Sequence, residues 1–257
     1  MGLMDGKKGF VFGVANDYSL AWQIAQQLHT EGASLAFNHL PNPKMERRVR
    51  LLAEPIGAKL IVPCDVSDDE QIKAVLHQAH EVMGPLDFIV HAIAFASRDA
   101  LSKPFYQTTR ADFLQAMEIS VYSLVALCRH ALEHMAPGAS VLCLTYLGSV
   151  KMIPGYNVMG VCKAALESST RYLAGELGRE KNIRVNALSA GPVRTLSSSA
   201  VSGFSKILDH YPTKAPLARN VEGEEVGKSG LYLLSDLSSG VTGEVHYVDA
   251  GYNVVGW

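Results

Sequence analysis

Gly-Phe-Val-Phe-Gly-Val-Ala-Asn-Asp-Tyr-Ser-Leu, residues 9–20, joins a short apolar run to the start of a helix. The first four residues predict a buried strand, and Gly13 with the small Ala15 allows a tight turn. Ser19 is a helix-capping residue placed directly before Leu20. Such a junction can offer backbone N–H groups and a helix dipole to a diphosphate. Because GxGxxG is absent, the segment is equally compatible with an ordinary strand–turn–helix connection.

Apolar, strand-like runs alternate with longer helical patterns along the whole chain. Candidate strands lie at Phe10–Val14, Ser34–Asn38, Lys59–Cys64, Leu86–His91, Ala139–Tyr146, Ile183–Leu188 and Glu244–Val248. Candidate helices lie at Leu20–Thr30, Lys44–Glu54, Asp68–Val82, Arg110–His134, Asn157–Leu177 and Glu222–Leu234. This alternation predicts an α/β fold: a single doubly wound, Rossmann-type domain over residues 1–257, with a seven-stranded parallel sheet and helices on both faces.

Composition excludes several classes of partner. Hydrophobic residues make up 48% of the 257, which is enough for a substantial core, and the net charge of −2 gives no argument for nucleic acid. No apolar run approaches the ~18 residues of a membrane span. The four cysteines lie in apolar surroundings at irregular spacing, so we expect free thiols and a cytoplasmic location.

Tyr156 and Lys163 carry the strongest chemical signal. A separation of seven residues is close to two helical turns, so both side chains share one helix face. Pro154 and Gly155 mark a loop-to-helix boundary, which puts Tyr156 near the first turn. A phenol and an ammonium converging on one ligand indicate a hydride-transfer site, with Tyr146 at the end of the preceding strand. The spacing alone also occurs by chance.

Residues just after the strands should line the ligand site, because ligands of such sheets bind at the carboxyl ends of strands. Asp65 could accept from an adenine amino group and Val66 could pack on the ring, although an acid there could also precede a helix. Residues 38–41 hold no acid for a ribose 2′-hydroxyl and no arginine for a 2′-phosphate, and we favour NADH over NADPH. Val193 could cover a nicotinamide and Thr195 could bond its amide, or the segment is a plain turn.

Histidine spacing suggests no metal centre. His130 and His134 are four apart, as in some metal sites, but the preceding run is apolar and no third ligand is in view. We therefore predict no metal. His77 and His80 lie in a polar helical stretch and are expected to be solvated.

Together these segments resemble the short-chain dehydrogenase/reductase superfamily and, within it, the bacterial NADH-dependent enoyl-acyl-carrier-protein reductases. The resemblance covers essentially the whole chain and is most specific at residues 13–21, 146–148, 156–160 and 184–196. The superfamily usually places its tyrosine four residues before the lysine. Here that position is Met159, and the tyrosine stands seven before, as in the enoyl reductases.

The resemblance implies a set of site residues. Those expected to line the cofactor, with Ala15 added from the turn, are Gly13, Ser19, Leu20, Leu40, Asp65, Val66, Ile93, Lys163, Val193, Arg194, Thr195, Leu196 and Ser197. Ala96, Tyr146 and Tyr156 would line the acyl site, and residues 195–210 would form a substrate lid. The implied partner is an acyl-carrier protein bearing the enoyl group, and the implied assembly is a homotetramer.

The resemblance also implies a mechanism. Hydride would pass from NADH to the β-carbon of a trans-2-enoyl thioester, and Tyr156 would stabilise the enolate oxygen. Lys163 would hold the ribose hydroxyls and lower the pKa of Tyr156. Tyr146 would contact substrate, or else simply pack on the core.

Two alternatives stay open. A carbonyl (3-ketoacyl) reductase of the same fold is disfavoured by Met159. A non-catalytic dinucleotide-binding paralogue is kept open by Ala92-Ile93-Ala94, where the family typically carries Ser-Ile-Gly. Ala94 adds a methyl group where a planar inhibitor would stack, so weaker binding of diphenyl ethers is expected.

Overall fold

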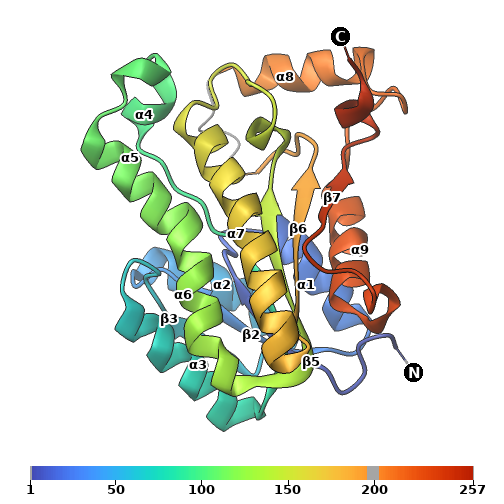
Figure 1. Cartoon of the computed structure of the whole chain (residues 1–257). Helices are drawn as coiled ribbons and strands as arrows, with labels where there is room; N and C mark the ends of the chain where they lie inside the picture. Colours follow the sequence, from blue (N-terminus) through green and yellow to red (C-terminus); the bar gives the residue numbers. More distant parts are fainter. Residues whose placement is uncertain (1, 196–202, 257) are drawn as a thin grey trace.

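The computed structural model describes residues 2–195 and 203–256, and within them seven strands form one parallel sheet (Figure 1). The strands are β1 (Lys8–Phe12), β2 (Ser34–His39), β3 (Leu60–Pro63), β4 (Leu86–His91), β5 (Met135–Thr145), β6 (Arg184–Ala190) and β7 (Val245–Val248). Their order in space is β3-β2-β1-β4-β5-β6-β7, so the winding reverses between β1 and β4. Ligands of such sheets bind beyond the strand ends at that reversal.

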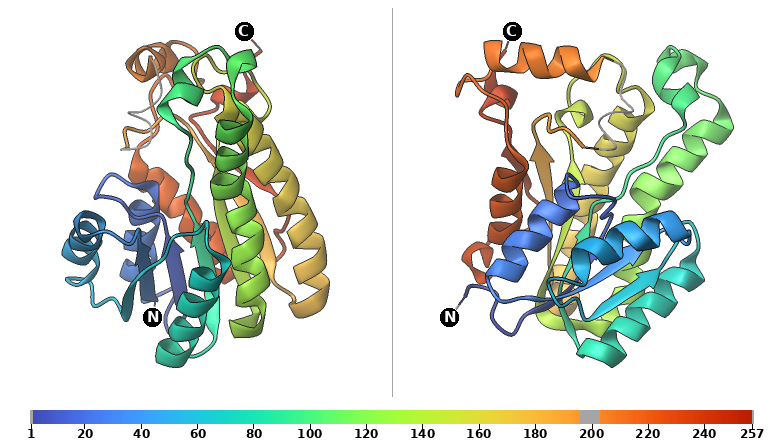
Figure 2. Two further views of the ribbon diagram at one scale, coloured as in Figure 1. Left: turned by 90° about the vertical axis from the view of Figure 1, so that its left-hand side faces the viewer. Right: turned by 180° about the vertical axis from the view of Figure 1, so that it is seen from behind.

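Helices cover both faces of the sheet, as the two views of Figure 2 show. On one face lie α1 (Leu20–Thr30), α2 (Pro43–Ala53) and α9 (Gly223–Leu234), and on the other α3 (Asp69–Met83), α6 (Ser123–Ala131) and α7 (Val158–Lys181). Neighbouring residues of β1 point to opposite faces: Phe10 and Phe12 join one buried cluster and Val11 the other. The predicted doubly wound α/β fold is confirmed.

The helix that the sequence predicts over Arg110–His134 is found with these bounds, but it is not a regular α-helix throughout. The chain forms α5 (Arg110–Met117), a π-helical turn at Glu118–Tyr122, α6, and a 3₁₀ turn at Leu132–His134. Within the π turn, the Ser120 hydroxyl accepts from the Phe95 N–H at 3.0 Å and donates to the Phe95 carbonyl oxygen at 3.2 Å. We attribute the irregular turn to these tertiary hydrogen bonds. The apolar periodicity of the sequence contains no information about them.

The same segment, Arg110–His134, is long and apolar enough to cross a membrane by length and composition alone. Its helices instead pack along α3 and α7, and many of its apolar residues belong to the buried core. Core packing therefore accounts for the apolar character of the segment.

Two short helices are absent from the sequence prediction. They are α4 (Arg98–Ser102) and α8 (Phe204–His210), each too short to show a clear helical period. Figure 1 shows α8 across the carboxyl-end side of the sheet and α4 beside the amino-terminal end of α7. The expected lid, residues 195–210, is described at Thr195 and from Gly203 onward; the remainder lies outside the described residues.

All four cysteines fall within the described ranges and are buried free thiols. The prediction of solvated histidines is wrong for His80, which is half-buried with its ring centroid 5.1 Å from that of His134. Helix α3 presses this side chain against the turn after α6. Among residues 2–195 and 203–256, no three histidine, cysteine or acidic side chains are grouped so as to hold a metal ion.

Candidate active site

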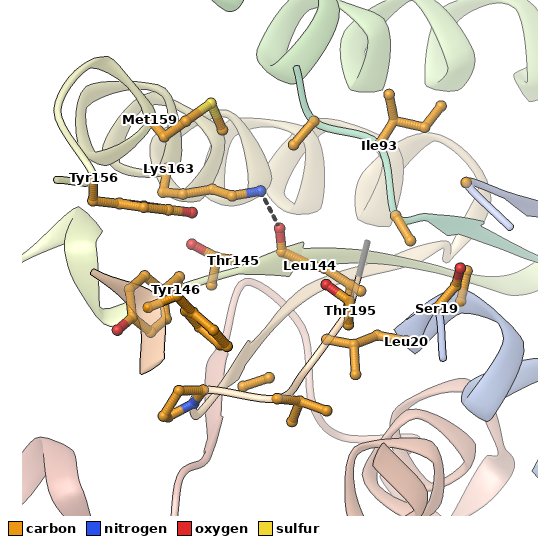
Figure 3. Close-up of a pocket in the computed structure, with 18 of the residues that line it drawn as sticks. Ser19, Leu20, Ile93, Leu144, Thr145, Tyr146, Tyr156, Met159, Lys163 and Thr195 are labelled. Atoms are coloured by element: carbon orange, nitrogen blue, oxygen red, sulfur yellow. Dashed lines mark hydrogen bonds between the residues drawn. The ribbon is translucent and has the colours of Figure 1, made fainter. Parts of the chain in front are cut away.

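A cavity of about 380 Å³ opens beyond the carboxyl ends of β1, β4, β5 and β6 (Figure 3). It brings together the predicted residues Gly13, Ala15, Ser19, Leu20, Ile93, Ala96, Tyr146, Tyr156, Lys163, Val193 and Thr195. Leu40, Asp65, Val66 and Arg194 do not belong to its lining, and Leu196 and Ser197 lie outside the described residues. Segments far apart in sequence therefore meet where the topology places a ligand site.

The turn between β1 and α1 is shaped by hydrogen bonds that sequence did not predict. Gly13 adopts φ 103°, and a Cβ there would lie 2.2 Å from the Ala92 carbonyl oxygen. Ser19 does not cap α1 as expected: its hydroxyl accepts from the N–H groups of Ala15 and Asn16, each at 3.0 Å. These bonds hold the turn from within. Leu20 and Ala21, whose N–H groups precede the first intrahelical bond at Trp22, line the cavity.

The ends of β2 and β3 lie to one side of this cavity. Buried Asn38 accepts from the Gly13 N–H at 3.2 Å and donates to the Cys64 carbonyl oxygen at 3.3 Å, which ties three strand ends together. Asp65 accepts from the Ser67 N–H at 3.0 Å and the Ser67 hydroxyl at 2.7 Å, so its carboxylate stabilises a turn. Val66 is buried in the core. An adenine-binding role for these residues stays a prediction.

Lys163 lies on the buried face of α7. Its Nζ donates to the Leu144 carbonyl oxygen at 2.7 Å (Figure 3). The side chain is only 6% exposed, and burial lowers the pKa of the ammonium below its usual value. Lys163 is therefore a buried residue of the site and not a solvated lysine on the helix surface.

Tyr156 and Tyr146 meet edge to face, with ring centroids 4.9 Å apart and an interplanar angle of 73°. Close packing requires Gly148, because a Cβ there would lie 2.5 Å from the Tyr156 ring. Desolvation raises the pKa of Tyr156 well above its usual value and that of Tyr146 to about 12. The expectation that Lys163 lowers the pKa of Tyr156 is wrong in this structure, because desolvation dominates. Both phenols stay protonated and can donate.

Met159, in the first turn of α7, also lines the cavity and stands in the sequence between Tyr156 and Lys163 (Figure 3). A thioether cannot donate a hydrogen bond, so this position supplies shape rather than a proton. Of these three side chains, the Tyr156 phenol and the Lys163 ammonium can donate a hydrogen bond.

A buried polar pair in the site was missed from sequence. The Thr145 hydroxyl donates to Glu167 Oε1 at 2.6 Å, and both side chains are 5% exposed. Glu167 stands one turn after Lys163, so an acid on the buried face of a helix was the available signal. Apolar lining residues were also missed, among them Leu101 from α4 and Phe204 and Ile207 from α8.

Known proteins resemble the chain over its full length. A family model described as enoyl-(acyl carrier protein) reductase matches residues 13–253. The enoyl-[acyl-carrier-protein] reductase [NADH] FabI of Nostoc sp. is 50% identical over 255 residues, which cover 98% of each chain. The enoyl-[acyl-carrier-protein] reductase [NADH] 1 of Rhizobium meliloti is 51% identical over 99% of this chain and 93% of its own.

Solved structures give the same picture. The Bacillus cereus enoyl-acyl carrier protein reductase, in complex with NADP⁺ and indole naphthyridinone, has a TM-score of 0.96 at 46% identity, and 100% of each chain is covered. The reductase of Anaplasma phagocytophilum, in complex with NAD, has a TM-score of 0.95 at 50% identity and covers 100% of this chain and 97% of its own.

Proposed function

Because the chain belongs to the enoyl-(acyl carrier protein) reductase family, we propose that the cavity beyond β1, β4 and β5 is its catalytic site. The protein is an NADH-dependent oxidoreductase that reduces the trans-2 double bond of enoyl-acyl-carrier-protein in fatty-acid elongation. One observation carries the assignment of the site: Tyr156, in the turn before α7, and Lys163, on α7, line the same cavity. Met159 stands between them, where a ketone-reducing relative would place its tyrosine.

The cavity offers a donor set that fits a dinucleotide. The first N–H groups of α1 suit an anionic diphosphate, and the Lys163 ammonium suits paired ribose hydroxyls. Val193 and Thr195 lie in the segment that follows β6, where they would contact the nicotinamide. NADH, when bound there, supplies the hydride for the β-carbon.

Tyr156 would act on the thioester carbonyl oxygen of the substrate, while hydride is added at the β-carbon. As negative charge develops on the thioester oxygen, a protonated phenol in a desolvated pocket stabilises it by donating a hydrogen bond. Its raised pKa matches this task, because a phenol that stays protonated remains a donor. Tyr146 packs against the Tyr156 ring and would fix its orientation.

The acyl chain would lie against the apolar part of the wall. Ala96, Leu101, Phe204 and Ile207 contribute side chains there, the last two from α8. We assign α8 to the substrate lid expected over residues 195–210. Its Lys206 and the nearby Lys214 offer positive charge for docking an acidic carrier protein.

Assembly and location also belong to the proposal. Exposed apolar side chains on α5 through α7, namely Leu114, Tyr122, Val161 and Tyr172, support a homotetramer with subunits joined along these helices. Four buried free thiols fit a reducing cytoplasm. Size-exclusion chromatography with light scattering tests the assembly: a monomer would contradict it.

The reaction is tested by following NADH oxidation with a trans-2-enoyl thioester beside a 3-ketoacyl thioester. Turnover of the enoyl compound alone is expected. Turnover of the ketone instead would favour the carbonyl reductase, and tight NADH binding without either turnover would favour a non-catalytic protein. NADPH in place of NADH should give slower turnover.

A further inference from the structure

Asn157, the residue after Tyr156, has an unusual backbone conformation. Its φ of 42° and ψ of −123° lie where glycine is favoured and a side chain is strained. Such strain persists only when surrounding contacts hold the residue in place. The contacts of the Asn157 side chain therefore point to its role.

The side-chain amide of Asn157 reaches the carboxyl end of α4. Its Nδ2 donates to the carbonyl oxygens of Lys103, Leu101 and Ala100 at 2.8, 3.2 and 3.4 Å. The last carbonyl groups of a helix lack intrahelical partners, and a single –NH₂ group with two hydrogens serves three of them here. Asn157 is thus a clamp between α7 and a separate helix.

The other end of α4 is tied to a different element. Ser97 caps α4 by accepting from the Ala100 N–H at 3.1 Å, and its hydroxyl donates to Asp112 of α5 at 2.6 Å. Helix α4 is therefore fastened to α5 at its start and to α7 at its end. It contributes to a small apolar cluster with the first turns of α7, apart from the two clusters on the sheet.

The attachment of α4 affects the shape of the cavity because α4 supplies part of the cavity wall. Leu101, whose carbonyl Asn157 holds, lines the cavity, as does Tyr156 immediately before Asn157 in the chain. One side chain thus links the wall to the backbone of the phenol-bearing residue. Loss of the clamp would let α4 move away from Tyr156 without disturbing the turn at the start of α1.

We propose that Asn157 is a positioning residue that fastens the α4 wall to the segment carrying Tyr156 and so sets the width of the acyl site. The inference rests on the proposed function in that the cavity binds an enoyl thioester. The proposal concerns only the part of the cavity that binds the acyl chain, so NADH binding should not change.

Two substitutions separate the clamp from the strain. Asn157→Gly removes the donor and relaxes the positive φ, so the chain should fold well. Asn157→Asp keeps the size but places a carboxylate against three carbonyl groups. Asn182→Gly is the matched control, because Asn182 is the positive-φ asparagine at the far end of α7, with φ 55°.

Steady-state kinetics provide the first readout. Loss of about two hydrogen bonds should raise the KM for a trans-2-enoyl thioester roughly fivefold to thirtyfold. The KM for NADH should be unchanged, and the preference between short and long acyl chains should narrow as the wall loosens. The Asn182→Gly control should match the wild type. Unchanged acyl selectivity, or an equal rise in both KM values, would overturn the proposal.

Hydrogen exchange provides a readout that does not depend on turnover. Amides of residues 98–103 should exchange faster in both Asn157 variants than in wild type or control. Unaltered exchange there would overturn the clamp. If wild type failed to reduce any enoyl thioester, the proposed function would fail, whereas the exchange data would still decide whether Asn157 fastens α4.

Discussion

Lys163 donates from Nζ to the main-chain carbonyl oxygen of Leu144 at 2.7 Å, which joins the second turn of the site helix α7 to the end of β5. An ammonium has three donors, and this bond fixes one of them (Figure 3). It is the only hydrogen bond of Nζ within residues 2–195 and 203–256, so two donors remain to meet ribose hydroxyls. The Lys163 side chain is thus already oriented toward the cofactor site in the absence of cofactor.

Lys163→Met should abolish tight cofactor binding. Loss of about two charge-assisted hydrogen bonds corresponds to roughly 3 kcal/mol, or about a hundredfold in the Kd for NADH. NADH fluorescence titration measures this Kd. The control is Lys181→Met, since Lys181 also bonds a main-chain carbonyl from α7, that of Leu132 at 2.9 Å. Equal affinity in the two variants would contradict the assignment.

Ser19→Ala should weaken NADH binding by about tenfold, the value of one or two lost hydrogen bonds. The hydroxyl latches the Ala15 and Asn16 N–H groups, so its loss would let the β1–α1 turn relax away from the diphosphate position. The KM for NADH measures the effect. Ser169→Ala, which removes a hydroxyl bonded to the Ala165 carbonyl oxygen on α7, should leave this KM unaltered.

His91 should make stability fall on mild acidification. Its Nε2 bonds the Ser123 hydroxyl at 2.7 Å, and that hydroxyl itself donates to the Ile119 carbonyl oxygen, so His91 Nε2 carries the proton. Burial, helped by Lys163, lowers the pKa of His91 to about 3. Below about pH 6.5, His91 therefore binds a proton in the unfolded chain but stays neutral in the folded protein. Above about pH 6.5, His91 is neutral in both states and does not change the free energy of unfolding. As the pH falls from about 6.5 toward 3, the free energy of unfolding decreases.

The measurement is the free energy of unfolding by urea at two pH values. The His91 contribution is at most about 1.4 kcal/mol per pH unit. His91→Gln, which retains a donor for Ser123, should lose less stability than wild type between about pH 6.5 and 5.5. His29→Gln removes an exposed histidine and should keep the wild-type difference. Identical losses in all three proteins would show that His91 is not the proton-linked group.

Ala94→Gly should strengthen binding of a planar aromatic inhibitor such as a diphenyl ether. Ala94 lines the cavity, so its methyl group would crowd a planar ring that stacked against this part of the wall. Relief of such crowding corresponds to about 1–3 kcal/mol, or roughly tenfold or more in the inhibition constant. Unchanged inhibition in Ala94→Gly would remove the argument.

Local patterns predicted most of the fold because its elements are long and strongly apolar. Helix α1 is found over Leu20–Thr30 and β4 over Leu86–His91, as predicted. Sequence periodicity failed at the π-helical turn and at α4, where tertiary hydrogen bonds from Ser120 and Asn157 hold the backbone. Propensity describes one segment at a time and contains no information on such bonds.

The site shows the same division. Helix geometry predicted that Tyr156 and Lys163 converge, and they do line one cavity, although Tyr156 lies in the turn before α7 and only Lys163 is on the helix. The role of the Ser19 hydroxyl was not, because a serine at a helix start can bond forward into the helix or back into the preceding turn. The Thr145–Glu167 pair joins a strand end to a helix, a contact that only the folded chain reveals.

The most direct test of the central claim is the rate of NADH-dependent reduction of a trans-2-enoyl thioester by Tyr156→Phe. Tyr106→Phe is the control, because Tyr106 does not line the cavity and is 83% exposed. Loss of the donor to the developing oxyanion should lower kcat by about 10²–10³, with the Kd for NADH unchanged and the control fully active. A Tyr156→Phe protein that turns over at the wild-type rate would contradict the account.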